Sequence, residues 1–182
     1  MKVFETGLKD CFLLEATIFK DNRGYFFESY NKNKFKELTG LDIDFIQDNQ
    51  ASSSKNVVRG LHIQRPPHMQ SKLVRAISGV IWDVAVDVRK NSPTYGKWFG
   101  AELSETNNRQ LFVPQGFLHG YSVLSEHAVV AYKCDDFYNK SAEDNAYLFD
   151  KNLAIDWKVS ELEAIISEKD IADSPFNIFK AI

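Results

Sequence analysis

The alternation of residues 80–88 is the sequence feature that most strongly limits the fold of this chain. The segment reads VIWDVAVDV, and successive side chains on a strand point to opposite faces. One face would carry Val80, Trp82, Val84, Val86 and Val88, and the other would carry Ile81, Asp83, Ala85 and Asp87. A two-residue period rich in β-branched side chains is typical of a strand. The segment therefore predicts one strand of a β-rich fold.

Short apolar segments recur along the chain and are separated by turn residues. They are 11–19, 45–51, 57–63, 73–77, 97–103, 111–113, 120–125 and 128–133. Turn residues stand between them at Ser78-Gly79, Asn91-Ser92-Pro93 and Pro114-Gln115-Gly116. Many short strands at nearly regular spacing indicate a sandwich or a small barrel. Helices are predicted only towards the two ends, at Asn31–Leu38 and at Ser160–Ile166, where Ser160 and Glu163 fit a capping box.

Composition and charge exclude several classes of protein. The 182 residues contain no linker, repeat or low-complexity stretch, so one domain over residues 1–182 is expected. No apolar run approaches the roughly 18 residues of a membrane-spanning helix, and charges throughout residues 1–20 argue against a signal peptide. A net charge of −3 argues against a nucleic-acid partner. The two cysteines are too few for a disulfide scaffold, which favours a cytoplasmic protein.

The histidines argue against a metal site. A metal-binding β-barrel favours His-x-His on one strand, because both ligands then project to the same side. Here the strand reads Gly60-Leu61-His62-Ile63-Gln64, so the second position holds an amide, which is a poor ligand. We therefore expect no metal and no other cofactor.

His62 has cationic neighbours that could be structural or functional. Arg59 lies inside an apolar run, and Lys72 begins another, LVRAI at 73–77. Such side chains are commonly solvated at the surface, but the pattern fits a polar pocket equally well. From periodicity alone both interpretations stay open.

Three other positions also allow two interpretations. His119 follows a turn and fits either a buried histidine or a ligand contact. Tyr132 ends an apolar run and fits core packing, although a tyrosine that faces a histidine across a pocket would act as an acid, since its ordinary pKa is near 10. The segment 21–28, DNRGYFFE, fits a hairpin turn and an edge strand, and the guanidinium of Arg23 could clamp a phosphate. The chain contains no GxGxxG, P-loop, CxxC or GxSxG motif.

Seven segments in order form a pattern that is more specific than any one motif. They are Asp21–Glu28 (DNRGYFFE), Gln47–Ser54 (QDNQASSS), Val58–Arg75 (VRGLHIQRPPHMQSKLVR), Gly79–Tyr95 (GVIWDVAVDVRKNSPTY), Leu103–Gly120 (LSETNNRQLFVPQGFLHG), Tyr132–Tyr138 and Ile166–Asp170 (ISEKD). Together they resemble the dTDP-4-dehydrorhamnose 3,5-epimerase family over roughly residues 1–170. The resemblance implies a metal-free fold of the cupin type. This is a mostly β, double-stranded β-helix or jelly-roll barrel with short flanking helices.

The resemblance also implies a substrate and a catalytic set. The substrate is a dTDP-linked 4-keto-6-deoxy sugar, whose C4 carbonyl acidifies the C–H bonds at C3 and C5. His62 would be the base, and Asp170 would orient its imidazole. Tyr132 would be the acid that returns the proton, and Lys72 would stabilise the enolate.

Substrate-binding residues are implied in the same way. They are Arg23, Phe26, Glu28, Gln47, Asn49, Arg59, His119, Tyr138, Glu143 and Lys169. Arg23 and Arg59 would hold the diphosphate, while Tyr138 would stack on thymine with Phe26 nearby. The family forms homodimers in which N-terminal strands pack on the partner's sheet, so we expect a homodimer whose pocket could contain groups from both chains.

The sequence leaves some departures and alternatives open. Met69, Ser71 and Leu118 stand where the family carries smaller residues, and these bulkier side chains near the mouth of the pocket could reduce the fit of the substrate. An epimerase that acts at C3 or C5 alone remains the alternative enzyme. A nucleotide-sugar-binding protein without catalysis, or a metal-dependent cupin enzyme, would be a different class of protein.

Overall fold

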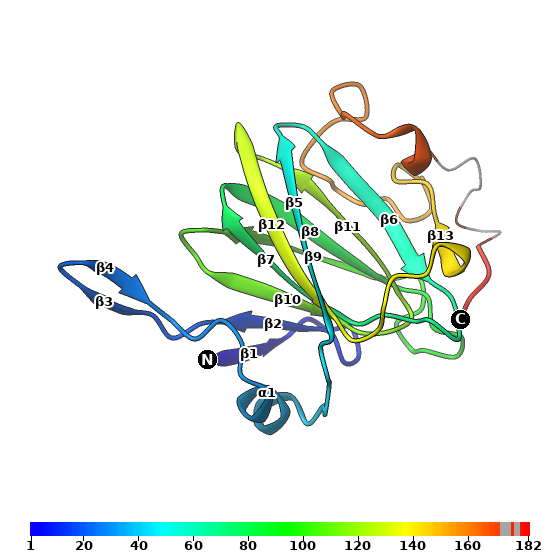
Figure 1. Ribbon diagram of the computed structural model, residues 1–182. Helices are drawn as coiled ribbons and strands as arrows, with labels where there is room; N and C mark the ends of the chain where they lie inside the picture. Colours follow the sequence, from blue (N-terminus) through cyan, green and yellow to red (C-terminus); the bar gives the residue numbers. More distant parts are fainter. Residues whose placement is uncertain (172–175, 177–178) are drawn as a thin grey trace.

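Two antiparallel sheets form most of the computed structural model, which describes residues 1–171, 176 and 179–182 (Figure 1). The first sheet has the strand order β1 (Lys2–Glu5), β2 (Phe12–Glu15), β10 (Arg109–Val113), β7 (Lys72–Ser78), β12 (His127–Cys134), β5 (Gln47–Ser54). The second has the order β13 (Glu143–Asn145), β6 (Val58–Gln64), β11 (Phe117–Val123), β8 (Val80–Asp87), β9 (Trp98–Ser104). A buried cluster that includes Val74 and Val130 from one sheet and Ile81 and Ala85 from the other joins them. The architecture confirms the predicted mostly β barrel of the cupin type.

The strand predictions are confirmed, with shifted ends. The run at 11–19 contains β2 and ends on Phe19, the first residue of another strand, so it is not one continuous strand. Strand β11 begins at Phe117 and so includes the residues after the turn at 114–116. On β8 the alternation separates two environments. Ile81 and Ala85 face the core between the sheets, while Val84 and Val86 pack in a second cluster with Trp157 from the C-terminal segment. This strand is therefore buried on both faces.

One of the two helix predictions is confirmed. Helix α1 (Lys32–Thr39) is capped by Asn31, whose side chain accepts the N–H of Lys34 at 3.1 Å, and it buries Phe35. Its C-cap is Gly40, whose φ of 75° lies in the left-handed region that glycine tolerates. Two short 3-10 elements also occur among the described residues, η1 (Lys140–Ala142) and η2 (Glu168–Asp170). Within the described ranges, no helix is long and apolar enough to cross a membrane.

The helix predicted at Ser160–Ile166 is wrong. The segment forms a turn at residues 161–163 and then a parallel bridge between Ile165 and Val57. The N–H of Ile165 donates to the carbonyl of Asn56 at 2.9 Å, and the carbonyl of Ile165 accepts the N–H of Val58 at 3.0 Å. Pairing with a distant strand therefore uses the backbone groups that a helix would need. Ser160 does contact Glu163, but through their side chains, at 2.6 Å.

The segment Asp21–Glu28 contains the predicted hairpin turn and edge strand. Strands β3 (Phe19–Asp21) and β4 (Gly24–Phe26) pair only with each other, and Figure 1 shows this hairpin standing away from the two sheets. Phe19, Tyr25 and Phe26 are exposed on it. An isolated two-stranded hairpin is at best marginally stable in water. We therefore expect these apolar side chains to be buried against another protein surface.

Asp87, at the end of β8, is a buried carboxylate with a full set of donors. It accepts hydrogen bonds from Arg89 Nη2 at 2.9 Å, Ser92 Oγ at 2.5 Å and Thr94 Oγ1 at 2.6 Å. Burial alone would raise the pKa of Asp87, but these bonds outweigh it and hold the pKa below its usual 3.8. The bonds stabilise the charged form, so their contribution is complete above the unfolded pKa and is lost as the pH falls through the folded pKa.

We expect Asp87→Asn to lower the free energy of unfolding by about 3 kcal/mol at pH 7, because Arg89 loses its buried partner. The difference from the wild type should shrink as the pH falls below about 4, because Asp87 of the unfolded wild-type chain then takes up a proton while the folded carboxylate, with its lowered pKa, still carries its charge. Urea denaturation of both proteins between pH 7 and pH 3 measures this. A constant difference across that range would show that the charge of Asp87 does not stabilise the fold.

Candidate active site

A polar pocket lies where the two sheets face each other, and most of the predicted site residues line it. The lining includes His62, Lys72, Tyr132, Gln47, Asn49, Arg59, His119, Tyr138, Glu143 and Lys169. Strand register explains the gathering on the first sheet, where Tyr132 pairs with Asn49 and Cys134 pairs with both Gln47 and Lys72. Since side chains two apart share a face, Lys72, Tyr132 and Gln47 all point to the interior.

The second sheet supplies the opposite wall of the pocket. His62 on β6 pairs directly with His119 on β11, and Gln64 pairs with Glu143 on β13. The polar interpretation of Arg59 and Lys72 is therefore correct, because both line this pocket. The two walls carry different chemistry: the imidazoles of His62 and His119 come from the second sheet, and the side chains of Lys72 and Tyr132 come from the first.

His62 and Asp170 form a pair across 108 positions of the sequence. His62 Nε2 lies 2.7 Å from Asp170 Oδ1, and the Asp170 side chain is 3% exposed. Burial would raise the pKa of Asp170, but its hydrogen bond with His62 and a further bond from Ser167 lower it, so the group is a carboxylate. A carboxylate fixes the tautomer with a proton on Nε2, which leaves the lone pair of a neutral imidazole on Nδ1. The pair is equipped to accept a proton.

Tyr132 and Lys72 lie next to each other on the first sheet. The Lys72 ammonium is 5.9 Å from the centroid of the Tyr132 ring. Burial raises the pKa of Tyr132 to about 12, so its hydroxyl stays protonated at neutral pH. Burial also lowers the pKa of Lys72 below its usual 10.5, although Cys134, Asp83 and Glu143 act in the other direction. Within the part of the chain that the structure describes, Lys72 has no ion-pair partner.

His119 meets both interpretations of the sequence. It is buried, and its Nε2 lies 2.9 Å from Oδ1 of the fully buried Asp83, yet it lines the pocket. Burial lowers the pKa of His119, although the neighbouring carboxylate opposes that shift. The sequence pattern places Asp83 on a strand face but does not predict this contact. It also missed Tyr121, which lines the pocket and which the two-residue period from His119 could have identified.

One end of the pocket is formed by the loop that carries Tyr138 and by the short elements β13 and η2. The hydroxyl of Tyr138 donates to Glu143 Oε2 at 2.9 Å, and its backbone N–H donates to Gln47 Oε1 at 3.0 Å. Gln47 Nε2 donates in turn to Asn49 Oδ1 at 3.2 Å. Lys169 precedes Asp170, and its carbonyl accepts from Asn145 Nδ2 at 2.9 Å. These contacts connect the loop, β5 and β13.

Three predicted binding residues lie outside this pocket. Arg23, Phe26 and Glu28 belong to the projecting hairpin and the segment after it. The Arg23 side chain is 86% exposed and pairs with Asp21 at 2.6 Å, and Phe26 is 70% exposed. Glu28 pairs with Lys34 on α1 at 2.8 Å. Within one chain the hairpin stands away from the barrel, so these three residues do not line the pocket that the other predicted residues form.

The structure also places Gln64 and the three residues that depart from the family pattern, Met69, Ser71 and Leu118. The amide oxygen of Gln64 accepts the N–H of Asn139 at 2.6 Å, so the protein itself occupies the atom that would face a metal. No cluster of three or more metal-ligating His, Cys, Asp or Glu occurs in the described ranges.

Met69, Ser71 and Leu118 are absent from the pocket lining, and Leu118 packs in the apolar cluster behind β8. The expected effect of these residues on the fit of the substrate stays a prediction.

Comparison with known proteins identifies relatives along almost the whole chain. The family model described as dTDP-4-dehydrorhamnose 3,5-epimerase matches residues 5–177. The dTDP-4-dehydrorhamnose 3,5-epimerase of Salmonella typhimurium is 48% identical over 172 residues, which are 94% of this chain and 93% of that protein. A crystal structure of the enzyme of the same name from Elizabethkingia anophelis is 54% identical, with a TM-score of 0.93 and 97% of each chain covered.

A second solved structure carries a ligand. It is the dTDP-6-deoxy-D-glucose-3,5-epimerase of Legionella pneumophila in complex with dTDP-4-keto-L-rhamnose. It is 41% identical with a TM-score of 0.93, and the match covers 98% of this chain and 94% of that one. These matches agree with the pocket chemistry described above, and the chain belongs to the dTDP-4-dehydrorhamnose 3,5-epimerase family.

Proposed function

We propose that this protein epimerises C3 and C5 of dTDP-4-dehydro-6-deoxy-D-glucose to give dTDP-4-dehydro-L-rhamnose, a step of dTDP-rhamnose biosynthesis. The observation that carries the proposal is the arrangement of the pocket. A base held by a buried carboxylate, His62 with Asp170, lies on one wall, and a protonated phenol, Tyr132, lies on the other. Inversion at a carbon requires a proton to leave from one face and to return on the opposite face.

The reaction begins with the carbonyl at C4. It weakens the C–H bonds at C3 and C5, but a ketone α-proton is still far too weakly acidic for a free imidazole. His62 Nδ1 takes the proton, and Asp170 stabilises the imidazolium. The electron pair moves to the C4 oxygen, where the Lys72 ammonium stabilises the enolate. Tyr132 donates its phenolic proton to the opposite face of the carbon.

The remaining pocket residues bind the nucleotide sugar. Arg59 supplies a guanidinium for the diphosphate, and Tyr138 supplies an exposed ring on which thymine stacks. The other residues of this binding set are Gln47, Asn49, His119, Glu143 and Lys169. The net charge of −3 does not oppose an anionic substrate, because the cations gather in this pocket.

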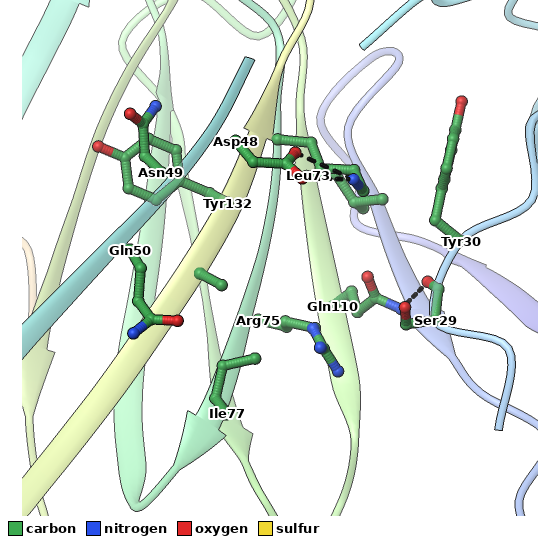
Figure 2. Close-up of a pocket in the computed structure, with 12 residues that line it drawn as sticks. Ser29, Tyr30, Asp48, Asn49, Gln50, Leu73, Arg75, Ile77, Gln110 and Tyr132 are labelled. Carbon is green, nitrogen blue, oxygen red and sulfur yellow. Dashed lines mark hydrogen bonds and ion pairs between the residues drawn. The ribbon is translucent and has the colours of Figure 1, made fainter. Parts of the chain in front are cut away.

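We also propose that the active form is a homodimer. Figure 2 shows a second pocket on the outer face of the first sheet, where Arg75 lies between Gln50 and Gln110. Burial lowers the pKa of Arg75, which has no carboxylate partner in the part of the chain that the structure describes. An open sheet face and a hairpin with exposed aromatic side chains both need cover, and a second copy would supply it.

In this dimer Arg23, Phe26 and Glu28 reach the pocket of the partner subunit. Their distance from their own pocket supports this proposal. Each active site would then combine the catalytic groups of one chain with the hairpin of the other.

We further propose that residues 1–182 act as one domain, and that the protein is cytoplasmic, since the buried Cys11 and Cys134 form no disulfide in the described ranges.

Mixing two impaired variants tests the shared site. We expect Arg23→Ala to lower kcat/KM by about 10- to 100-fold through lost diphosphate binding, and His62→Asn to be nearly inactive. In a mixed dimer one site carries both substitutions and the other carries neither. Co-refolding equal amounts should therefore restore about a quarter of the wild-type activity. No gain over the separate variants would show that Arg23 serves its own chain or none.

An epimerase that acts at one carbon would use the same base and acid. A binding protein without catalysis would have no use for the His62–Asp170 pair, which speaks against that alternative. Exchange of the substrate's hydrogens with solvent separates the three possibilities.

A further inference from the structure

The side chain of Gln64 is buried, and all of its hydrogen bonds go to backbone groups. Gln64 lies on β6 and is 6% exposed. Its Oε1 accepts the N–H of Asn139 at 2.6 Å, and its Nε2 donates to the carbonyls of His68 at 2.7 Å and Phe137 at 3.3 Å. An amide group has two N–H donors, and both are used here. Gln64 thus fastens the loop residues on either side of Tyr138 to the barrel.

Tyr138 is held from three directions. Its neighbours Phe137 and Asn139 are bonded to Gln64, and its own N–H is bonded to Gln47. Its hydroxyl donates to Glu143, which pairs with Gln64 across β13 and β6. The ring itself stays 54% exposed at the pocket. The side chain is therefore fixed in direction while its aromatic face remains available.

We propose that Gln64 is a positioning residue for the nucleotide base. It holds the segment 137–139 so that the ring of Tyr138 is already placed when the base arrives, which avoids the entropy cost of ordering this loop on binding. The inference rests on the proposed function, in which Tyr138 stacks on thymine. Position 64, where a metal-binding barrel would carry a ligand, thereby organises the base-binding end of the pocket.

A double-mutant cycle on dTDP binding tests the inference. Gln64→Met keeps the length of the side chain and removes every hydrogen bond to the loop. We expect Q64M and Y138A each to raise the Kd for dTDP about tenfold, by calorimetric titration. If Gln64 acts through Tyr138, the double variant binds dTDP no more weakly than Y138A alone. At saturating substrate, kcat of Q64M should stay within about twofold of the wild type, because the proton carriers are untouched.

Gln115→Met provides the matched control. Gln115 is exposed and also bonds this loop, because its Nε2 donates at 3.0 Å to Oδ2 of Asp135, three positions before Tyr138. The Kd of the Gln115→Met variant for dTDP should not differ from that of the wild type. Where Q64M does not fold, Gln64→Glu serves in the same cycle, because it keeps the size and the acceptor and loses the donor to His68 and Phe137.

The outcomes distinguish the two proposals. An unchanged Kd in Y138A would refute the stacking role of Tyr138 and thus that part of the proposed function. The inference would be overturned if Y138A raises the Kd for dTDP and the Gln64 substitution raises it a further tenfold in the double variant. Gln64 would then act independently of the ring. An unchanged Kd in a folded Q64M protein would overturn it as well.

Discussion

A His62→Asn variant is expected to turn over the dTDP-4-keto sugar about 10⁴-fold more slowly than the wild type. Asparagine has a similar size and can still donate to Asp170, but it has no basic nitrogen with which to accept a carbon-bound proton. His62 is proposed to contact the sugar rather than the diphosphate or the base, so the Kd for dTDP should change less than about threefold. Steady-state kinetics and calorimetric titration measure the two quantities.

His127→Asn is the control for this substitution. His127 is exposed at the start of β12, bonds Ser52 Oγ at 2.7 Å and lies outside the pocket lining. Its replacement should leave kcat unchanged. A His62→Asn enzyme that retains more than a tenth of the wild-type kcat would contradict the assignment of His62 as the base.

Lys72→Met is expected to lower kcat by about 10²- to 10³-fold, the usual effect of removing a group that stabilises a developing oxyanion. Methionine fills the same space without the charge. The substitution should affect kcat more than KM, because the interaction strengthens as the enolate forms.

The pH profile identifies Lys72 more directly. Burial lowers the pKa of Lys72 below 10.5, whereas it raises the pKa of Tyr132 to about 12. Activity that needs the ammonium form must fall as the pH rises through the lowered pKa of Lys72, before Tyr132 ionises. In Lys72→Arg this decline should move to higher pH, because a guanidinium stays protonated. A decline at the same pH in Lys72→Arg would assign it to another group.

The sequence predicts local structure well where the pattern is local. The two-residue alternation of β8 is visible in residues 80–88 alone, and both of its faces are buried, although one of them carries Asp83 and Asp87. Asn31 predicts the start of α1 because an N-cap acts on residues three positions away. At Ser160–Ile166 the same kind of local signal fails, because Ile165 pairs with Val57 about a hundred residues earlier. A capping motif carries no information about such a partner.

The candidate site depends mainly on contacts between distant residues. The register that pairs His62 with His119, and the contact of His62 with Asp170, are not encoded by any spacing in the sequence. Periodicity alone could not decide whether Arg59 and Lys72 are surface residues or pocket residues. The resemblance of the ordered segments to the family assigned both to the pocket. That resemblance also assigned Arg23, whose position beyond the pocket the proposed dimer would explain. The bonds of Gln64 to the backbone of a loop leave no sequence pattern at all.

Proton NMR of the reaction in heavy water tests the central claim most directly. Each proton that His62 removes is replaced by one that derives from solvent, so the wild-type enzyme should place deuterium at both C3 and C5 of the dTDP-4-keto-6-deoxy sugar. The account predicts loss of both proton signals and the appearance of dTDP-4-dehydro-L-rhamnose. Deuterium at a single carbon would identify an enzyme that epimerises only that position, and no incorporation at either carbon would contradict the proposed reaction.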